Sequence, residues 1–380
     1  MTKSANKITG AVILAFITLF GALTLFGNKS NVSVTENRQL SELPKITADK
    51  LYSGKTTEEL GAYITDNFAG RSHWISAKTA LQTELSESIV NGVYIGNDRL
   101  LDIDASHRAP ISVNADIFSR YAANYGGTVY FAVIPTSSGI YGDILPAYVN
   151  NRSDSQQISA FYDLLEGNKN IRKIDAFNIL KMLKDNYIYY CNDTKWTSYG
   201  AYYVYKTVIR KLGFQPTSYD KYTIEHVTNN FRGNLYNRTL SKKTKADIID
   251  IYDYPEGADV ISCVCTRSDG STFKGSIYDR SRLDTSDMYS MYLGEAVPFM
   301  KITTSANSDK KLLVIKDSYA DCFIPFLIQH YKEIMVVSPE DMDGFISDYI
   351  NVNDYEQTLF LFGIENLGDR KTLEKIIERN

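Results

Sequence analysis

The sequence predicts a three-layer α/β/α protein with a central parallel sheet, a β-rich insertion and one N-terminal transmembrane helix. Residues 8–27 form a run of 20 positions without a charge. Beyond this run, apolar strands such as residues 128–134 alternate with amphipathic helices, which is typical of a parallel sheet covered on both faces. Residues 214–305 break the alternation with short strands and many turn residues, and this change predicts the insertion.

The composition excludes several classes of protein. A chain of 380 residues suggests two or three domains, or one large domain with insertions. Hydrophobic residues make up 44% and charged residues 23%, which excludes a wholly disordered or fibrous chain. The net charge of −4 provides no broad basic field, so we expect no nucleic-acid partner.

The apolar run predicts a single-pass membrane protein whose bulk is extracytoplasmic. As a helix, residues 8–27 would extend ~30 Å, the thickness of the hydrocarbon core of a bilayer. Lys3 and Lys7 precede the run, so the positive-inside rule leaves the N-terminus in the cytoplasm. A cleaved signal peptide is the alternative, but the run exceeds the usual ~7–15 apolar residues and no small-x-small site follows. We therefore predict a cytoplasmic stub and signal anchor over residues 1–28.

The elements that follow the anchor can be predicted in order. Residues 29–55 are polar and contain Pro44, as expected of a linker or arm. A helix over residues 56–69 can be capped by Thr56 or Thr57. The next expected elements are a helix at 74–90, a hairpin at 93–102, helices at 115–124, 155–165 and 199–212, and strands at 128–134 and 171–174.

The second half of the chain begins with the insertion and ends with a return to the α/β pattern. Short strands are expected at 247–252 and 260–266 within the insertion. The later strands are expected at 311–315, 333–337 and 358–362, with helices from Ser318 to about His330, at 339–350 and at 371–379.

The four cysteines give no sign of a metal or disulfide framework. Cys263 and Cys265 are two positions apart in an expected strand, where their Cα atoms would be roughly 6.5–7 Å apart, too far for easy bonding. No Cys/His pair follows them at zinc-ligand spacing, and no glycine-rich loop suits a phosphate, so we expect no metal and no cofactor. Free buried thiols are the favoured interpretation.

Two segments carry residues suited to catalysis. The first is a buried strand that ends in Asp317-Ser318 before a helix, which places a serine at the carboxyl end of a sheet strand beside a helix N-terminus. These are the needs of a nucleophilic serine, although both residues could simply cap the helix. The second segment is Asp193-Thr194-Lys195-Trp196, where an Asp-x-His-Trp sequence would supply a base and its orienting carboxylate.

The two segments resemble those of the DHHW family of Gram-positive surface proteins, which is similar to the SGNH-like alginate O-acetylation proteins. Shorter matches occur in the same order along the chain. They are Glu36-Asn37-Arg38, Asn67-Phe68-Ala69-Gly70-Arg71, Val93-Tyr94-Ile95-Gly96, Ile134-Pro135-Thr136, Phe231-Arg232-Gly233-Asn234, Pro325-Phe326-Leu327 and Leu359-Phe360-Leu361-Phe362-Gly363. The resemblance implies an SGNH-like domain over residues 56–380, outside the membrane, and acyl transfer to surface polysaccharides.

The resemblance also implies site residues, with two departures. Ser318 and Asp193 carry over as catalytic residues, and Asp317, Trp196, Gly294 and Tyr319 are expected to line the substrate cleft. Lys195 stands where the family has its histidine, and Gly294-Glu295-Ala296 replaces a Gly-Gly-Asn segment that resembles part of an oxyanion hole. His330 would lie about three turns from Ser318, too far to replace the missing base.

Lys195 decides between two functional hypotheses. A lysine base must be neutral near pH 7, but a nearby Asp193 would keep it charged. The first hypothesis is therefore a degenerate catalytic site that binds glycan or a partner in a polysaccharide modification system. The alternative is an active O-acetyltransferase or esterase that uses Ser318 with Lys195 as base, with acyl groups supplied by a membrane-bound O-acyltransferase. In both, cell-surface polysaccharide is the expected partner.

Overall fold

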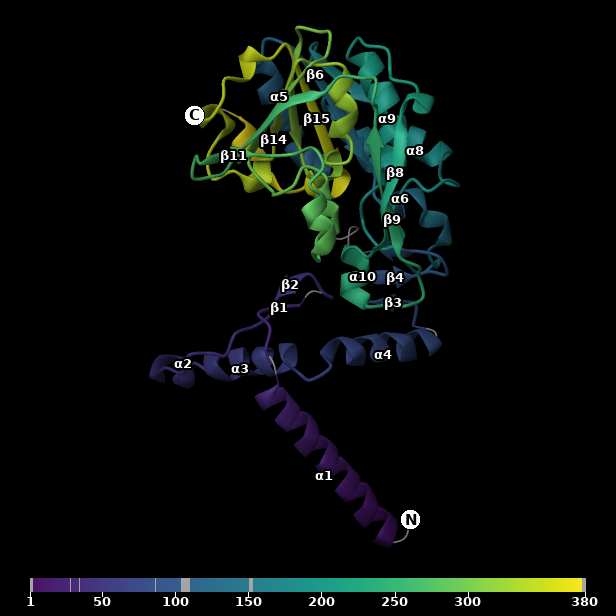
Figure 1. Cartoon of the computed structure of the whole chain (residues 1–380), viewed down its shortest axis with the longest axis vertical. Coiled ribbons are helices and arrows are strands. Elements are labelled where there is room, and N and C mark those ends of the chain that lie inside the picture. Colours follow the sequence, from purple (N-terminus) through teal and green to yellow (C-terminus); the bar gives the residue numbers. More distant parts are fainter. Residues whose placement is uncertain are drawn as a thin grey trace. The chain divides into compact units, whose positions relative to one another are not determined.

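The computed structural model describes residues 3–27, 29–33, 35–85, 87–103, 110–149 and 153–377 (Figure 1). The chain forms two compact units. The first contains Met1–Asn91 and Tyr236–Lys242, and the second contains Gly92–Leu235 and Lys243–Asn380. The predicted boundaries at residues 28 and 55 stay predictions.

The first unit is mainly helical. Its helix α1 contains a segment, Lys7–Thr24, that is long and apolar enough to cross a membrane. Its described helices and strands are α1 (Lys3–Phe26), β1 (Val32–Ser33), β2 (Arg38–Gln39), α2 (Ala48–Tyr52), α3 (Lys55–Asp66), α4 (Arg71–Glu84) and β3 (Ile89–Val90). The last residues of α10 (Asn234–Thr239) also belong to this unit.

Helices α3 and α4 differ from the prediction at their ends. Gly54, with φ of +77°, precedes α3, so the predicted caps Thr56 and Thr57 were wrong. The left-handed conformation of Gly54 suits a residue without Cβ, and it lets the helix begin at Lys55. Helix α4 stops at Glu84 rather than at residue 90, because the β-branched Ile89 and Val90 form β3.

Charged residues join the arm of the first unit to its helices. Arg38 Nε donates to Glu36 Oε2 at 2.9 Å, and Arg71 pairs with the other oxygen of Glu36. Asp66 accepts from Arg38 and from the Ser41 amide, and the Arg38 hydrogen bond is the main cause that lowers the pKa of Asp66 to about 2. Both carboxylates are about nine-tenths buried, so these pairs fix the arm against the end of α3 and the start of α4.

The second unit is built on a large mixed sheet of described strands. The strand order is β11-β10-β12-β14-β13-β15-β6-β7. The run from β14 to β7 is parallel, as predicted. The strands of this sheet are β6 (Thr128–Ile134), β7 (Ile171–Ile174), β10 (Val260–Thr266), β11 (Thr272–Lys274), β12 (Phe299–Thr304), β13 (Lys311–Lys316), β14 (Glu333–Val337) and β15 (Gln357–Gly363).

The insertion extends the sheet, which corrects the prediction of a wholly parallel one. Strand β12 pairs with β14 in the antiparallel direction, and β10 and β11 follow outward from it. Strands β8 (Thr223–Phe231) and β9 (Asp247–Asp253) pair only with each other among the described residues. Strand β12 pairs with the edge of β14 that faces away from β13, and the antiparallel part of the sheet continues outward from there.

Helices cover both faces of the sheet. Alternate residues of the strands point to opposite faces, so Tyr130, Ala132 and Ile134 join one core and Val129, Phe131 and Val133 the other. Helices α8 and α9 contribute to the first core, while α5 and α7 contribute to the second. The remaining elements are β4 (Val93–Ile95), β5 (Leu100–Asp102), α5 (Ala115–Asn124), α6 (Ser137–Ile140), α7 (Asp154–Leu164), α8 (Ala176–Met182), α9 (Ser198–Lys211) and α11 (Arg370–Leu373).

Two predicted helices in the C-terminal half were wrong, and a third is shorter than predicted. The segment after Ser318 contains two 3₁₀ turns, Ser318–Ala320 and Ile324–Gln329, and no α-helix. Pro325 has no amide hydrogen, so it cannot continue a helix that began at Ser318 and instead opens a new turn. Residues 339–350 also contain only 3₁₀ turns, and the C-terminal helix is limited to α11 and one such turn.

Strand β15 ends against a buried tyrosine. A Cβ atom built on Gly363 would collide with the ring of Tyr319, which is 1% exposed. The ring therefore occupies the space that a side chain at residue 363 would need. Glycine at this position permits the close approach of β15 to the turn that contains Ser318.

His330 is buried among aromatic rings in the first core. Its Nε2 atom lies 2.6 Å from the Tyr205 hydroxyl, and the rings of Tyr205 and Phe214 flank it. Burial lowers the pKa of His330 to about 4. His330 is therefore a neutral core residue, which agrees with its exclusion as a replacement base.

We expect the Gly363→Ala substitution to destabilise the second unit by about 1–3 kcal/mol, because the added methyl group overpacks the site of the Tyr319 ring. Gly126→Ala is the matched control, since its Cβ would meet only Asn353 Oδ1 at 3.6 Å. Urea unfolding of the detergent-solubilised chain measures both. Equal stability of the two variants would contradict this packing argument.

We also expect His330 to make the protein less stable in mild acid. The unfolded state binds a proton at about pH 6.5 and the folded state only at about pH 4, so the free energy of unfolding falls as the pH decreases through this window. The loss amounts to about 3 kcal/mol by pH 4. His330→Phe keeps the ring but cannot be protonated, so its urea midpoint should vary less between these pH values than that of the parent chain. Parallel pH profiles would disprove this assignment.

Candidate active site

Ser318 lies where the central strand β13 ends. Strand β13 pairs with β14 on one side and β15 on the other, so its carboxyl end opens at the middle of the parallel part of the sheet. Ser318 is half-buried and begins a 3₁₀ turn. Its hydroxyl makes no hydrogen bond to any described residue. The position suits a nucleophile, but no described group accepts its proton.

Asp317 ties the ends of two strands together. Its Oδ1 atom accepts from the Tyr319 amide at 2.9 Å, and its Oδ2 atom accepts from the Gly363 amide and from Asn366 Nδ2, each at 2.7 Å. Burial raises the pKa of Asp317 to about 7, although these hydrogen bonds act in the opposite direction. Both oxygens point into the protein, so this residue supports the turn that carries Ser318.

The two segments singled out in the sequence meet through a pair of hydrogen bonds. Trp196 Nε1 donates to the Tyr319 carbonyl at 2.6 Å, and the Tyr319 hydroxyl donates to the Thr194 carbonyl at 2.9 Å. The side chains of Trp196 and Tyr319 are 0% and 1% exposed. The Asp193–Lys195–Trp196 loop is therefore held beside the residue that follows Ser318.

Asp193 is fixed by a neighbouring segment that the sequence did not link to it. Its Oδ2 atom accepts from the Asn234 amide at 2.7 Å, and its Oδ1 atom accepts from the Lys195 amide at 3.0 Å. A Cβ atom at Gly233 would collide with this carboxylate. The Arg232-Gly233-Asn234 motif was visible in the sequence, but its role in holding Asp193 was not.

Lys195 is a charged side chain at this site. Its Nζ atom lies 3.9 Å from Asp193 Oδ1, and its side chain is 20% exposed. Burial alone lowers the pKa of Lys195, but the carboxylates of Asp193, Glu365, Asp321 and Asp317 raise it by more, so the net pKa is above its ordinary value. Lys195 is therefore protonated at neutral pH and can donate but not accept a proton.

Tyr289 connects Lys195 to the 3₁₀ turn Ser318–Ala320, which we call the serine turn. The sequence analysis missed this tyrosine. Its ring centroid lies 5.2 Å from Lys195 Nζ, in the range of a cation–π contact, and its hydroxyl donates to the Ser318 carbonyl at 3.1 Å. Tyr289 belongs to the insertion, in the 3₁₀ turn Met288–Met291. With 28 tyrosines in the chain, no local pattern distinguishes this one.

A second ion pair joins the residues on either side of the serine turn. Lys316 Nζ and Asp321 Oδ1 are 2.6 Å apart, and both side chains are largely buried. Burial raises the pKa of Asp321, while Lys316 and Lys195 act to lower it. The two lysines therefore balance part of the acidic charge around the turn.

Gly294 lies in a turn of the insertion. It has φ of +80° and its amide donates to the Ser290 carbonyl at 3.0 Å. The next residue, Glu295, pairs with Arg267 at 2.9 Å. No interaction among the described residues joins Gly294 to Ser318 or Lys195, so its role in a cleft stays a prediction.

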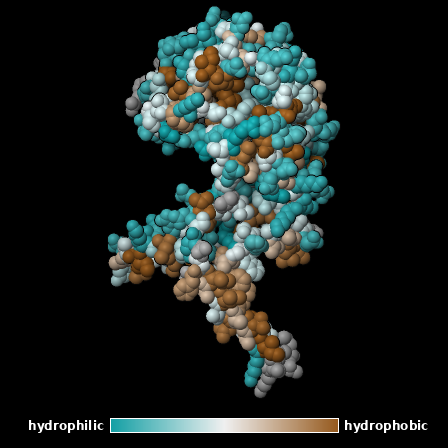
Figure 2. All heavy atoms as spheres, viewed as in Figure 1, coloured by the Kyte–Doolittle hydropathy of each residue, from teal (hydrophilic) through white to brown (hydrophobic). Residues whose placement is uncertain are grey.

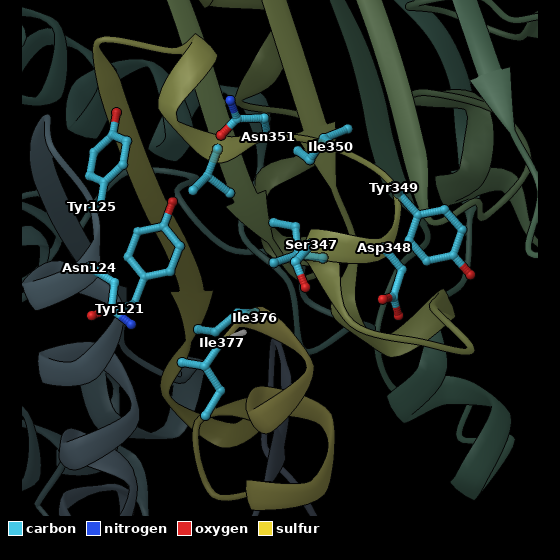
Figure 3. Close-up of a pocket in the computed structure, with 12 residues that line it drawn as sticks. Tyr121, Asn124, Tyr125, Ser347, Asp348, Tyr349, Ile350, Asn351, Ile376 and Ile377 are labelled. Atoms are coloured by element: carbon cyan, nitrogen blue, oxygen red, sulfur yellow. The ribbon is translucent and has the colours of Figure 1, made fainter. Parts of the chain in front are cut away.

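Two pockets among the described residues do not contain the predicted catalytic residues. One of about 400 Å³ lies between α5 and the segments around Ile346–Asp348 and Ile376 (Figure 3). Another of about 420 Å³ is lined by residues such as Arg99, Tyr141 and Lys184. Ser318, Asp193 and Lys195 line neither of them.

The described residues also offer no metal centre. No group of three or more His, Cys, Asp or Glu side chains in the described ranges is arranged to hold a metal ion. Cys191, Cys263, Cys265 and Cys322 all lie in described ranges and are free thiols.

Comparison with solved structures finds two proteins that share the fold and a third of lower similarity. A DHHW family protein from Eubacterium siraeum is 22% identical with a TM-score of 0.65, and the match covers 76% of this chain and 95% of that one. Bacillus cereus PatB1, solved with a sulfonyl adduct, is 17% identical with a TM-score of 0.62, over 72% and 95% of the two chains. The O-acetyltransferase domain of Pseudomonas putida AlgJ is 13% identical with a TM-score of 0.43, over 73% and 92%.

Comparison with family models assigns the family. No curated protein matches the chain. The DHHW protein family model matches residues 113–337, more than half of the chain, and this range contains Asp193, Lys195 and Ser318. The family predicted from the sequence is confirmed: the chain belongs to the DHHW family.

Proposed function

We propose that this protein is anchored in the cell membrane by residues 8–27 and acts outside the cytoplasm in the modification of a cell-surface polysaccharide. Its serine site is degenerate and binds glycan or a partner protein. Membership of the DHHW family supports the substrate class, because the resemblance implies acyl transfer to surface polysaccharides. The length and apolar composition of α1 support the anchor.

The charged state of Lys195 carries the proposal of a degenerate site. A nucleophilic serine needs a neighbouring base that can accept its proton. The ammonium of Lys195 has no free electron pair, and the surrounding carboxylates hold it in that state. Loss of a general base typically lowers the rate by ~10²–10⁴.

The segment at Gly294 supports the same conclusion. The family's Gly-Gly-Asn segment is replaced by Gly294-Glu295-Ala296, so an alanine stands at the asparagine position, and the neighbouring Glu295 carboxylate is paired with Arg267. A lost oxyanion donor typically lowers the rate by a further ~10²–10³. Together the two changes leave little capacity for acyl transfer, while the buried frame around Ser318 is retained.

One observation favours an active enzyme as the second candidate. The 3.9 Å separation of Lys195 Nζ from Asp193 Oδ1 exceeds the ~2.8 Å of a charge-assisted hydrogen bond, so the lysine is not locked to the carboxylate. In this alternative, Ser318 is the nucleophile, Lys195 is the base, Asp193 orients it, and a membrane-bound O-acyltransferase supplies the acyl group.

Labelling with phenylmethylsulfonyl fluoride tests the missing base. An activated serine oxygen attacks sulfur, the S–F bond breaks, fluoride leaves, and the base takes the serine proton. We expect the detergent-solubilised full chain to stay unlabelled and the Lys195→His variant to gain one adduct at Ser318, measured by intact mass. The neighbour PatB1 was solved with a sulfonyl adduct, so the reagent class suits this fold.

Two controls make the labelling decisive. Lys169→His changes an exposed lysine in the same unit and should leave the chain unlabelled. Adding Ser318→Ala to Lys195→His should abolish the adduct. Labelling of the parent chain at Ser318 would overturn the degenerate site.

Hydrolysis of an acetyl ester separates the two candidates further. We expect no activity of the parent chain between about pH 6 and about pH 10, because Lys195 stays protonated over most of this range. Activity that rises with pH and disappears in Ser318→Ala would establish Lys195 as a working base.

A further inference from the structure

We propose that α3 and α4 lie along the outer surface of the membrane, with Trp74 and the apolar stripe of α4 in the outer lipid leaflet. The proposal rests on the membrane anchor proposed above. It concerns only the first unit, and its occupant is phospholipid.

An aromatic cluster joins α1 to the junction of α3 and α4. The Trp74 ring centroid lies 5.9 Å from that of Phe16 and 5.6 Å from that of Phe20, both in edge-to-face geometry. Phe20 also stacks on Phe68 at 5.8 Å. The Ala69 amide donates to Thr24 Oγ1 at 3.2 Å, so the contact continues toward the end of α1.

The position of this cluster along α1 places it within the bilayer. Residues 8–27 extend ~30 Å as a helix, just enough to cross the hydrocarbon core. If the part of α1 from Phe16 onward stood above the membrane, residues 8–15 would remain, and they extend only ~12 Å. A span that short cannot cross, so at least part of the α1 segment that contacts Trp74 lies within the bilayer.

Helix α4 carries an apolar stripe on the same side as Trp74. Trp74, Leu81 and Leu85 are 45%, 62% and 69% exposed, and their spacing of seven and four residues places them on one face of a helix. Thr79 lies on the opposite face, is 2% exposed, and donates to the Thr239 carbonyl at 2.6 Å. One face of α4 is therefore packed against Thr239, whereas on the other face Trp74 contacts α1 and Leu81 and Leu85 are exposed.

Further exposed apolar side chains lie in the arm and in α2 and α3. They are Leu43, Ile46, Leu51, Tyr52, Leu60 and Ile64. Hydrophobic side chains are visible along this helix row and along α1 (Figure 2), and α3 and α4 cross the C-terminal end of α1 (Figure 1). Tryptophan and tyrosine favour the membrane interface, where an amphipathic helix buries its apolar face ~5–10 Å.

The charges near Trp74 are compatible with this placement. Lys78, one turn further along the same face of α4, is exposed and can extend its ammonium to the lipid headgroups. Arg71 pairs with Glu36, and Arg38 pairs with Glu36 and Asp66. Paired charges lose less on leaving bulk water than isolated ones do. Lipid is favoured over a protein occupant because the stripe begins at the residue that contacts the proposed span.

Quenching of tryptophan fluorescence by brominated lipid tests the proposal directly. The chain has two tryptophans, and Trp196 is 0% exposed in the second unit. The full chain is reconstituted in phosphatidylcholine–phosphatidylglycerol liposomes with and without dibrominated acyl chains. We expect a loss of emission in brominated liposomes that is absent in Trp74→Phe. The remaining emission then comes from Trp196.

A matched pair of reporters extends the test along α4. In the Trp74→Phe background, Leu81→Trp should be quenched, whereas Leu164→Trp, at a comparably exposed leucine (56%) of the second unit, should not. Flotation of the liposomes after an alkaline wash measures the anchor separately. If the chains float but neither Trp74 nor Leu81→Trp is quenched, this proposal is overturned and the anchor is supported. A protein would then be the expected occupant of the stripe. Chains that do not float would overturn both.

Discussion

The reciprocal hydrogen bonds between Tyr319 and the loop that contains Lys195 determine the geometry of the candidate site. Tyr319 accepts from Trp196 and donates to Thr194, and both aromatic side chains are fully buried. Breaking either bond would leave a buried polar group without a partner, which costs about 1–3 kcal/mol. The end of β13 and the Asp193 loop, more than 100 residues apart in the chain, therefore keep a fixed relation, and Ser318 is positioned by its neighbour.

The same residues serve folding, so under the proposed degenerate site the frame can be kept without the chemistry. Trp196 belongs to the core on one face of the sheet, Asp317 joins the ends of β13 and β15, and Asp193 holds the Asn234 amide. Each would be retained for stability alone. Lys195 differs because its side chain is partly exposed and makes no hydrogen bond to a described residue, whereas its amide donates to Asp193 and its carbonyl accepts from the Tyr190 amide. A change at this side chain therefore disturbs fewer hydrogen bonds of the frame than a change at Trp196, Asp317 or Asp193.

Local patterns in the sequence were enough for much of the fold. The apolar runs at Thr128–Ile134 and Glu333–Val337 became strands with the predicted bounds, because a strand buried on both faces has a distinctive composition. Val260–Thr266 also has the predicted bounds, although one of its faces is largely exposed. The pairing of β12 with β14, and the contacts of Tyr289 and Gly233, depend on residues far apart in the chain. No single segment carries that information, so the insertion and half of the site needed the structure.

The proposal of a degenerate site depends on how the pKa values of histidine and lysine respond to the same surroundings. A histidine begins with a pKa near 6.5, so adjacent carboxylates raise it only into a range where it still exchanges protons at neutral pH. A lysine begins near 10.4, and the same carboxylates move it further from neutrality. The acidic groups that raise the pKa of Lys195 are Asp193, Glu365, Asp321 and Asp317. Because Asp193 and Asp317 also hold the buried frame, the chain cannot lose them to restore a neutral lysine without loosening the site that the lysine would serve.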